Sequence, residues 1–180
     1  MFGKQRILAT AIVLFCSVCL QSPVGGGSGA SEYSVKAAFL YQFSLFIDWP
    51  SDAFANPSAP LIIGVLGDDP FGSTLDKTVK DKTVNGRRFV IKRFESLEDL
   101  QYCHILFVSS SEEDHLSRVL DRLKSSSTVT VSDIHHFAKQ GGIIGFVIRD
   151  NRIGLQINAG AAKEARVKIS SKLLRLADVI

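Results

Sequence analysis

Apolar and polar positions follow two different periods along the chain, and these predict helices and strands in alternation. Between residues 33 and 49, apolar side chains recur at steps of three and four, the spacing of one helical face. They are Val35, Phe39, Phe43, Phe46 and Ile47. Pro50 ends this helix, because the residue before a proline avoids the α region. The unbroken apolar run at 61–66 is typical of a strand covered on both faces.

Strands and helices continue to alternate after residue 66. Further strands are predicted at 88–92, 104–108, 128–131, 143–149 and 152–157. Helices are predicted at 71–79, 116–123 and 134–138, then from Asn158 and from Ser171 to the end. The last two strands are separated by Asp150-Asn151, the length of a β-hairpin loop. The pattern predicts an α/β fold, with a mostly parallel sheet flanked by helices on both faces and a C-terminal antiparallel β-hairpin.

Three side chains stand where predicted helices begin. Asp69 precedes Pro70, Ser111 precedes an acidic turn, and Asp133 follows a strand, and all three are residue types that cap helix N-termini. The last helix is expected to bury a group of apolar residues. These are Ile169, Leu173, Leu176 and Ile180.

The N-terminus has the three parts of a secretory signal peptide. A basic start at Lys4 and Arg6 precedes an apolar run and then small residues up to Ala30. The run is shorter than the roughly 20 residues that span a bilayer, which favours cleavage after Ala30 over an uncleaved anchor. We therefore predict a signal peptide at 1–30 and a single exported domain at 31–180.

Charge and cysteine content exclude several classes of protein. The 21 Lys and Arg residues against 18 Asp and Glu leave a net charge of +3, which argues against a dedicated nucleic-acid-binding domain. Three cysteines exclude a disulfide-dense scaffold, and only Cys103 remains in the predicted mature chain. Since an apolar strand follows it, we expect Cys103 to be a buried thiol, unpaired within the chain.

The sequence contains no motif for catalysis, a metal or a cofactor. Cys103 and His104 are neighbours on a predicted strand, so their side chains point to opposite faces and cannot act as nucleophile and base. His135 and His136 lack a partner at the spacing of a helical metal pair. The glycines form neither a dinucleotide-binding fingerprint nor a phosphate-binding loop. We therefore expect no enzymatic activity, no metal and no cofactor.

Polar side chains gather where a ligand would bind in an open α/β sheet, beyond the carboxyl ends of the strands. They are Asp68, Asp69, Ser109, Ser110 and Asp133. We expect them to line a ligand pocket. Alternatively, the aspartates only stabilise turns and cap helices, and this role also explains their positions.

A second group of residues is a candidate for binding a protein partner. Four of them lie off the main apolar face of the first helix, namely Tyr33, Leu40, Tyr41 and Leu45. A helix that is apolar on more than one side is either buried on both sides or exposes an apolar face that can bind a partner. Arg149 and Arg152 flank the hairpin loop and are suited to an anionic group, or are simply solvated turn charges.

An ordered series of motifs resembles the YfiR family of bacterial periplasmic proteins. The motifs are KAAFLYQF at 36–43 with Trp49-Pro50, CHILFVS at 103–109, TVSD at 130–133, Phe137-Ala138, GGII at 141–144, Ile157-Asn158, and SSKLLRLA at 170–177. Each motif is ordinary by itself, but their order covers nearly all of residues 33–177.

The resemblance implies an α/β fold, a periplasmic location and a non-catalytic role. In the family, the regulator binds the periplasmic domain of an inner-membrane diguanylate cyclase and represses it. An outer-membrane lipoprotein relieves the repression by sequestering the regulator. The output is the level of cyclic-di-GMP, and hence biofilm formation and motility. Family members often carry disulfide pairs with one cysteine in the strand that matches 61–66, but this strand has none here.

The leading hypothesis is an exported regulator that represses a membrane diguanylate cyclase or another membrane sensor. An outer-membrane lipoprotein and a homodimer remain open as further partners. The alternative is a periplasmic small-molecule-binding component of a sensory or transport system, which would use the pocket at the strand ends.

Overall fold

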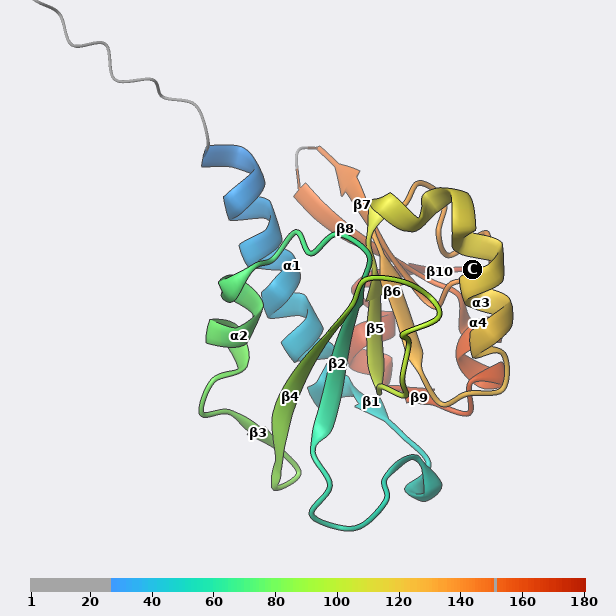
Figure 1. Cartoon of the computed structure of the whole chain (residues 1–180). Coiled ribbons are helices and arrows are strands. Elements are labelled where there is room, and N and C mark those ends of the chain that lie inside the picture. The colour runs from blue at the N-terminus through green and yellow to red at the C-terminus, as the bar shows by residue number, and fades with distance from the viewer. Residues whose placement is uncertain (1–26, 151) are drawn as a thin grey trace, which may run out of the picture.

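An eight-stranded sheet forms the centre of the computed structural model, which describes residues 27–150 and 152–180 (Figure 1). Its strands lie in the order β10-β8-β7-β6-β5-β2-β4-β3. They are β2 (Leu61–Leu66), β3 (Thr83–Val84), β4 (Arg87–Phe94), β5 (Ile105–Val108), β6 (Val129–Ser132), β7 (Ile144–Arg149), β8 (Arg152–Ile157) and β10 (Ala177–Val179). Neighbouring strands from β7 to β4 are parallel, whereas β8 is antiparallel to β7 and β3 to β4. The predicted α/β class and C-terminal hairpin are thus confirmed.

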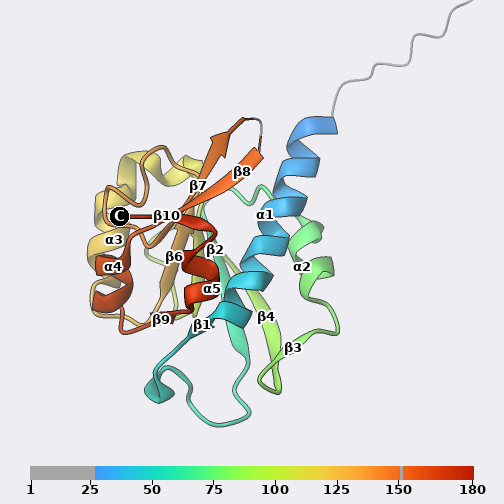
Figure 2. The ribbon, with the colours of Figure 1, turned by 180° about the vertical axis from the view of Figure 1, so that it is seen from behind.

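Helices cover both faces of the sheet. On one face lie α1 (Gly27–Phe46), α2 (Ser73–Val79) and α5 (Ser171–Leu174) (Figure 2), and on the other lies α3 (Leu116–Leu123). The short α4 (Ala159–Glu164) follows β8. The two faces of the sheet have separate hydrophobic cores, and successive residues of β5 point into different ones. Phe107 packs into the core under α1, and Leu106 packs into the core under α3. This alternation explains why β2 and β5 carry no polar side chain.

The first helix ends at Phe46, three residues before the predicted end, because the next two residues pair with another segment. β1 (Ile47–Asp48) forms an antiparallel ladder with β9 (Lys168–Ile169). The buried face of α1 is also rotated from the predicted one. Val35 is 43% exposed, while Leu40 and Phe43 are fully buried. Since Leu40 packs into the core, its prediction as a partner-binding residue is wrong.

The C-terminal end differs most from the prediction. The final helix is only the four residues of α5, and the chain then forms β10, parallel to β8. Leu173 is buried as predicted, but Leu176 is 74% exposed and Ile180 is 45% exposed. The backbone of β8 offers hydrogen-bonding groups beyond the hairpin, and β10 satisfies them where a longer helix would not.

None of the three residues predicted as N-caps caps a helix. α2 begins after Gly72, and Asp69 instead accepts a hydrogen bond from the Phe71 amide (2.8 Å) and pairs with Arg93 (2.6 Å). The segment after Asp133 forms turns, so its carboxylate is free to bind α1. Ser111 lies in a 3₁₀ turn (Ser110–His115) ahead of α3, and its hydroxyl accepts from the Asp68 amide (3.0 Å).

The predicted helix start at Asn158 and the predicted two-residue hairpin loop are confirmed. Asn158 caps α4 by accepting a hydrogen bond from the Ala161 amide (2.9 Å). Arg149 and Arg152 are paired at the end of the β7–β8 ladder, as a two-residue hairpin loop requires. Asn85 and Gly86 both have positive φ, at 50° and 77°, which suits the tight turn between β3 and β4.

The predicted signal peptide lies largely outside the described residues, and the predicted cleavage point after Ala30 falls in the first turn of α1. Within residues 27–150 and 152–180, no helix has the length and apolar character needed to cross a bilayer.

Candidate functional site

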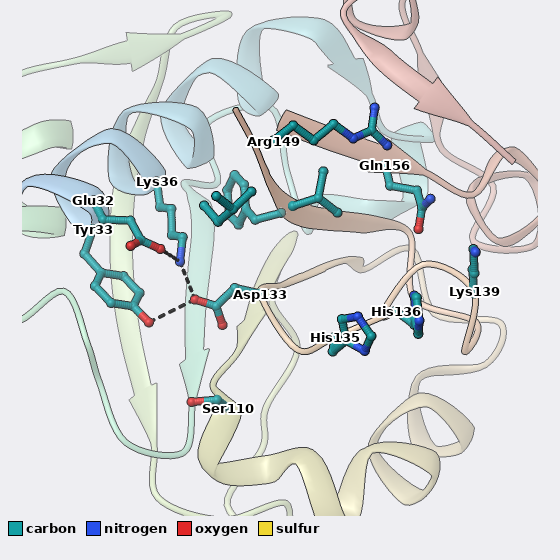
Figure 3. Close-up of a pocket in the computed structure, with 13 residues that line it drawn as sticks. Glu32, Tyr33, Lys36, Ser110, Asp133, His135, His136, Lys139, Arg149 and Gln156 are labelled. Atoms are coloured by element: carbon teal, nitrogen blue, oxygen red, sulfur yellow. Dashed lines mark hydrogen bonds and ion pairs between the residues drawn. The ribbon is translucent and has the colours of Figure 1, made fainter. Parts of the chain in front are cut away.

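The carboxyl ends of β5, β6 and β7 open onto a cavity of about 690 Å³ (Figure 3). Its walls come from the start of α1, the segments that follow β5 and β6, and the β7–β8 hairpin. Ser110 and Asp133 lie in the wall, as the strand-end argument predicts. The cavity therefore has the size and position of a small-molecule site in an open α/β sheet.

One wall is held by an ion cluster that joins α1 to the end of β6. Lys36 Nζ lies 2.5 Å from Asp133 Oδ2 and 2.5 Å from Glu32 Oε1 (Figure 3). The Tyr33 hydroxyl donates to the same Asp133 oxygen at 2.9 Å. Because the Lys36 side chain is only 3% exposed, its ammonium is stabilised by these two carboxylates in place of water.

The ion cluster changes the chemistry of Tyr33. Burial, together with the hydrogen bond to the Asp133 carboxylate, raises the pKa of the tyrosine well above its usual value. Tyr33 is therefore a hydrogen-bond donor at every physiological pH. Its hydroxyl is engaged within the chain, so only its ring is left for a contact with a partner. Asp133 Oδ1 is buried and accepts no hydrogen bond from the described residues.

The opposite wall is basic. It carries His135, His136, Lys139 and Arg149 (Figure 3). The two imidazole rings lie 3.7 Å apart between centroids, and the charge of His135 lowers the pKa of His136. Arg149 also forms an ion pair with Asp178 of β10. The cavity thus has an ion-paired side at α1, where two carboxylates share one ammonium, and a basic side at the turn after β6.

The floor between these walls is apolar. Phe146 lies beneath the Lys36 ammonium and stacks on Phe43 with 6.0 Å between ring centroids. Ile148, on the same strand, is 60% exposed. An apolar surface flanked by a few placed polar groups is the usual composition of a small-molecule site.

Three of the predicted pocket residues lie elsewhere. The Asp69 carboxylate forms an ion pair with Arg93, and the Asp68 amide donates a hydrogen bond to the Ser111 hydroxyl. Ser109 is buried, and its amide donates to the Leu66 carbonyl (3.0 Å). Sequence reasoning placed all strand ends at one site. The structure separates the end of β2 from those of β6 and β7, because β5 lies between them.

The remaining partner candidates have mixed surroundings. Tyr41 packs edge-on against Phe89 and carries the Lys82 ammonium 4.2 Å from its ring centre, so it is partly covered. Leu45 is 43% exposed, and Arg149 and Arg152 are exposed on the hairpin. Leu45 belongs to an exposed stripe on α1, which we call the outer face of α1. It consists of Val35, Ala38, Gln42 and Leu45.

Cys103 and His104 are both buried and carry no catalytic arrangement. Burial raises the pKa of the Cys103 thiol to about 12, and Cys103 is a free cysteine. Burial lowers the pKa of His104 to about 4. Its Nδ1 accepts the Ile62 amide (3.0 Å), and its ring stacks on Phe54 at 4.3 Å. At neutral pH the pair therefore supplies neither a thiolate nor a free base.

Sequence reasoning missed Lys36, His135, His136 and Lys139 as cavity residues. The two histidines and Lys139 closely follow Asp133 at the end of β6. The pattern Asp-x-His-His-x-x-Lys could therefore have indicated that they lie near the same strand end. The only indication for Lys36 was its position four residues after Glu32, which is the spacing of an ion pair on a helix. The described residues contain no group of three or more His, Cys, Asp or Glu side chains arranged to hold a metal ion.

The chain is similar to another protein of known structure. A conserved domain protein from Vibrio cholerae O1 biovar El Tor strain N16961 has a solved structure that aligns with a TM-score of 0.46 and 12% identity. The alignment covers 66% of this chain and 54% of that chain, so this chain spans about half of its length. No curated protein matches the sequence significantly.

A family model described as YfiR/HmsC-like matches residues 33–178, which is most of the sequence. The match includes α1 from Tyr33 onward, the whole eight-stranded sheet apart from the last residue of β10, and all the cavity residues except Glu32. Members of this family are periplasmic regulators in cyclic-di-GMP signalling. The chain belongs to the YfiR/HmsC-like family.

Proposed function

We propose that this protein acts in the periplasm by binding the periplasmic domain of an inner-membrane diguanylate cyclase and holding the cyclase inactive. The result is a lower level of cyclic-di-GMP and less biofilm. The observation that carries the proposal is the family match over residues 33–178. The buried thiol and neutral His104 agree with a role that involves docking and no covalent chemistry.

The docking surface that we propose combines the outer face of α1 with the β7–β8 hairpin. The outer face of α1 exposes Val35 and Leu45, and the hairpin exposes Ile148. Arg152 is exposed and has no ion pair within the described residues, whereas Arg149 is already paired with Asp178. A partner with an apolar patch beside acidic side chains complements this surface, because charge complementarity sets orientation and rate of association.

Repression by docking has an energetic requirement. A regulator shifts a two-state cyclase only through its difference in affinity for the two states. Moving the cyclase from almost fully active to almost fully inactive takes about 5.5 kcal/mol of differential binding. A few buried apolar anchors at the centre of an interface can supply this amount.

Deletion of the gene tests the proposal directly. We expect higher cyclic-di-GMP and stronger surface attachment, and both should return to the original level on complementation. Complementation with the double variant Leu45→Asp/Arg152→Glu should fail, because it places charge on the apolar face and inverts the charge of the hairpin. Lys124→Glu, an exposed change directly after α3 at the opposite face, is the matched control and should complement. Unchanged cyclic-di-GMP in the deletion strain would refute the repressor role.

A further inference from the structure

We infer that the cavity beyond β5, β6 and β7 binds a small organic anion. Its charged group, a carboxylate or a phosphate, lies against His135, His136 and Lys139, and its apolar body lies on the floor formed by Phe146 and Ile148. This inference goes beyond repression by docking and does not depend on it.

The size of the cavity points to an organic molecule. Its volume of about 690 Å³ lies within the range of roughly 300–1,000 Å³ that is typical of small-molecule sites. A bare inorganic ion would leave most of this space to water. The apolar floor, where Ile148 is 60% exposed, would gain from contact with an apolar ligand body.

The distribution of charge selects an anion. The two carboxylates in the α1 wall, Glu32 and Asp133, share the single Lys36 ammonium, so one negative charge remains on that side of the cavity. On the other side, His135, His136 and Lys139 form no ion pair with a carboxylate among the described residues. The other end of the cavity carries Lys139 beside the two imidazoles, and an anion is favoured at this end, away from the carboxylates (Figure 3).

The backbone at this end is held in a costly conformation. His136 has φ of 58°, in the left-handed region that residues other than glycine adopt infrequently. The Gln140 amide donates to the His136 carbonyl (3.0 Å) and the Gln140 side chain donates to the His135 carbonyl (2.9 Å). These bonds maintain a turn that holds both imidazoles beside Lys139, although their positive charges repel. Strained residues of this kind cluster at binding sites.

The repulsion predicts how binding depends on pH. The charged groups that line the cavity around the histidine pair are Glu32, Lys36, Asp133, Lys139 and Arg149. The charge of His135 is the main cause that lowers the pKa of His136, and desolvation and the charge of Lys139 add to it. A bound anion offsets that repulsion, so it should bind more tightly at acidic pH, where His136 gains a proton.

The test uses the purified protein and four probes that share a phenyl group. Phenyl phosphate and phenylacetate are the anionic arms, and benzyl alcohol and benzylamine are the neutral and cationic controls. Titration calorimetry should detect binding of at least one anion, tighter at pH 5.5 than at pH 7.5. Binding of phenyl phosphate alone assigns a phosphate ligand, and binding of phenylacetate alone assigns a carboxylate ligand.

Variants locate the site. Lys139→Gln should weaken binding about tenfold, the usual scale for one charge-assisted contact. His136→Asn keeps a residue type that tolerates positive φ and should remove most of the pH dependence. Lys172→Gln, an exposed lysine on α5 outside the cavity, should bind as the original protein does. Both cavity variants change exposed side chains, and circular dichroism verifies that they fold.

Three results would overturn the inference. They are the absence of anion binding at both pH values, equal binding of benzyl alcohol, and an equal loss of affinity in Lys139→Gln and Lys172→Gln. Each is measured on the isolated protein, so a failure here is distinct from a failure of the cyclase experiment.

Discussion

Lys36 illustrates how a single side chain can connect distant parts of the chain. It is 2% exposed and lies on the buried side of α1, where a charge is normally unfavourable. Asp133, 97 residues later, supplies the compensating carboxylate, and Tyr33 donates to the same oxygen. The cluster fixes the start of α1 against the end of β6 and so shapes the cavity between them.

A double-mutant cycle measures this coupling. Lys36→Met should lower the free energy of unfolding by about 3 kcal/mol, because it leaves Asp133 as a buried charge without its main partner. Asp133→Asn alone should also destabilise the protein. The double variant should lose clearly less than the sum, since neither partner is then left alone. Urea denaturation gives all four free energies, and strict additivity would contradict a direct pair.

His104 makes stability depend on pH. Its folded pKa of about 4 lies below the unfolded value of about 6.5, so only the unfolded chain gains a proton in that interval. Stability from this residue is therefore complete above pH 6.5 and is lost as pH falls toward 4, by about 2–3 kcal/mol.

The control for His104 is a residue that accepts a hydrogen bond but does not titrate. His104→Asn provides an oxygen near the Ile62 amide and should show a shallower loss of stability between pH 6.5 and 4. Denaturation midpoints at several pH values compare the two proteins. Parallel curves for both proteins would exclude His104 as the source of the pH dependence.

At the scale of elements, the register of β2 against β5 places one glycine against the free thiol. Gly64 pairs with Leu106, and a side chain at Gly64 would begin 3.0 Å from Cys103 Sγ. The resemblance locates one cysteine of a family disulfide in the strand that matches β2. The structure indicates that Gly64 is the position in β2 from which such a bridge would reach Cys103.

Gly64→Cys should therefore form a disulfide with Cys103. An S–S bond of about 2.05 Å leaves roughly 3 Å between one Cβ and the partner Sγ, which matches the position available. Phe94 and Leu106 also approach to 3.0 Å and must shift by a few tenths of an ångström. Oxidation should raise the free energy of unfolding by about 2–4 kcal/mol over the reduced form of the same variant.

Mass spectrometry and urea denaturation with and without reductant test this bridge. Gly64→Ser carries almost the same crowding without a second thiol, so its stability should not respond to reductant. A variant that keeps two free thiols under oxidising conditions would show that the register or the side-chain direction differs from the one described.

At the scale of the whole molecule, two cores lie on opposite faces of one sheet, and Cys103 belongs to the core under α3. Its thiol is 1% exposed, and burial raises its pKa to about 12, so almost no thiolate exists at neutral pH. A reagent can reach it only when the sheet and α3 separate. Local fraying of the hairpin or of α1 does not expose it.

Labelling of Cys103 should therefore report global unfolding. We expect a disulfide reagent such as Ellman's reagent to react with the mature native protein only slowly, at a rate that rises with urea as the unfolded population rises. Phe137→Ala, which empties part of the same core, should accelerate labelling in proportion to its loss of stability. Rapid labelling without denaturant, or a labelling rate that does not change with urea concentration, would contradict this placement of the thiol.

The sequence alone determined the elements whose signals are local. The apolar run of β2, the hairpin spacing and the helix start at Asn158 each depend on a few neighbouring residues, and all were predicted. Fold class followed from their order. Strand-end polarity also identified Ser110 and Asp133 as cavity residues, since parallel strands end at one edge.

Only the tertiary structure decided which sides of these elements meet. The buried face of α1 is set by the sheet and by β9, so Leu40 is in the core and Val35 is outside. A strand formed at 177–179 because β8 offered an open edge, although the local pattern continued a helix. Lys36 found Asp133 across 97 residues. Such contacts join residues that are far apart along the chain, and no short stretch of sequence contains both residues of the pair.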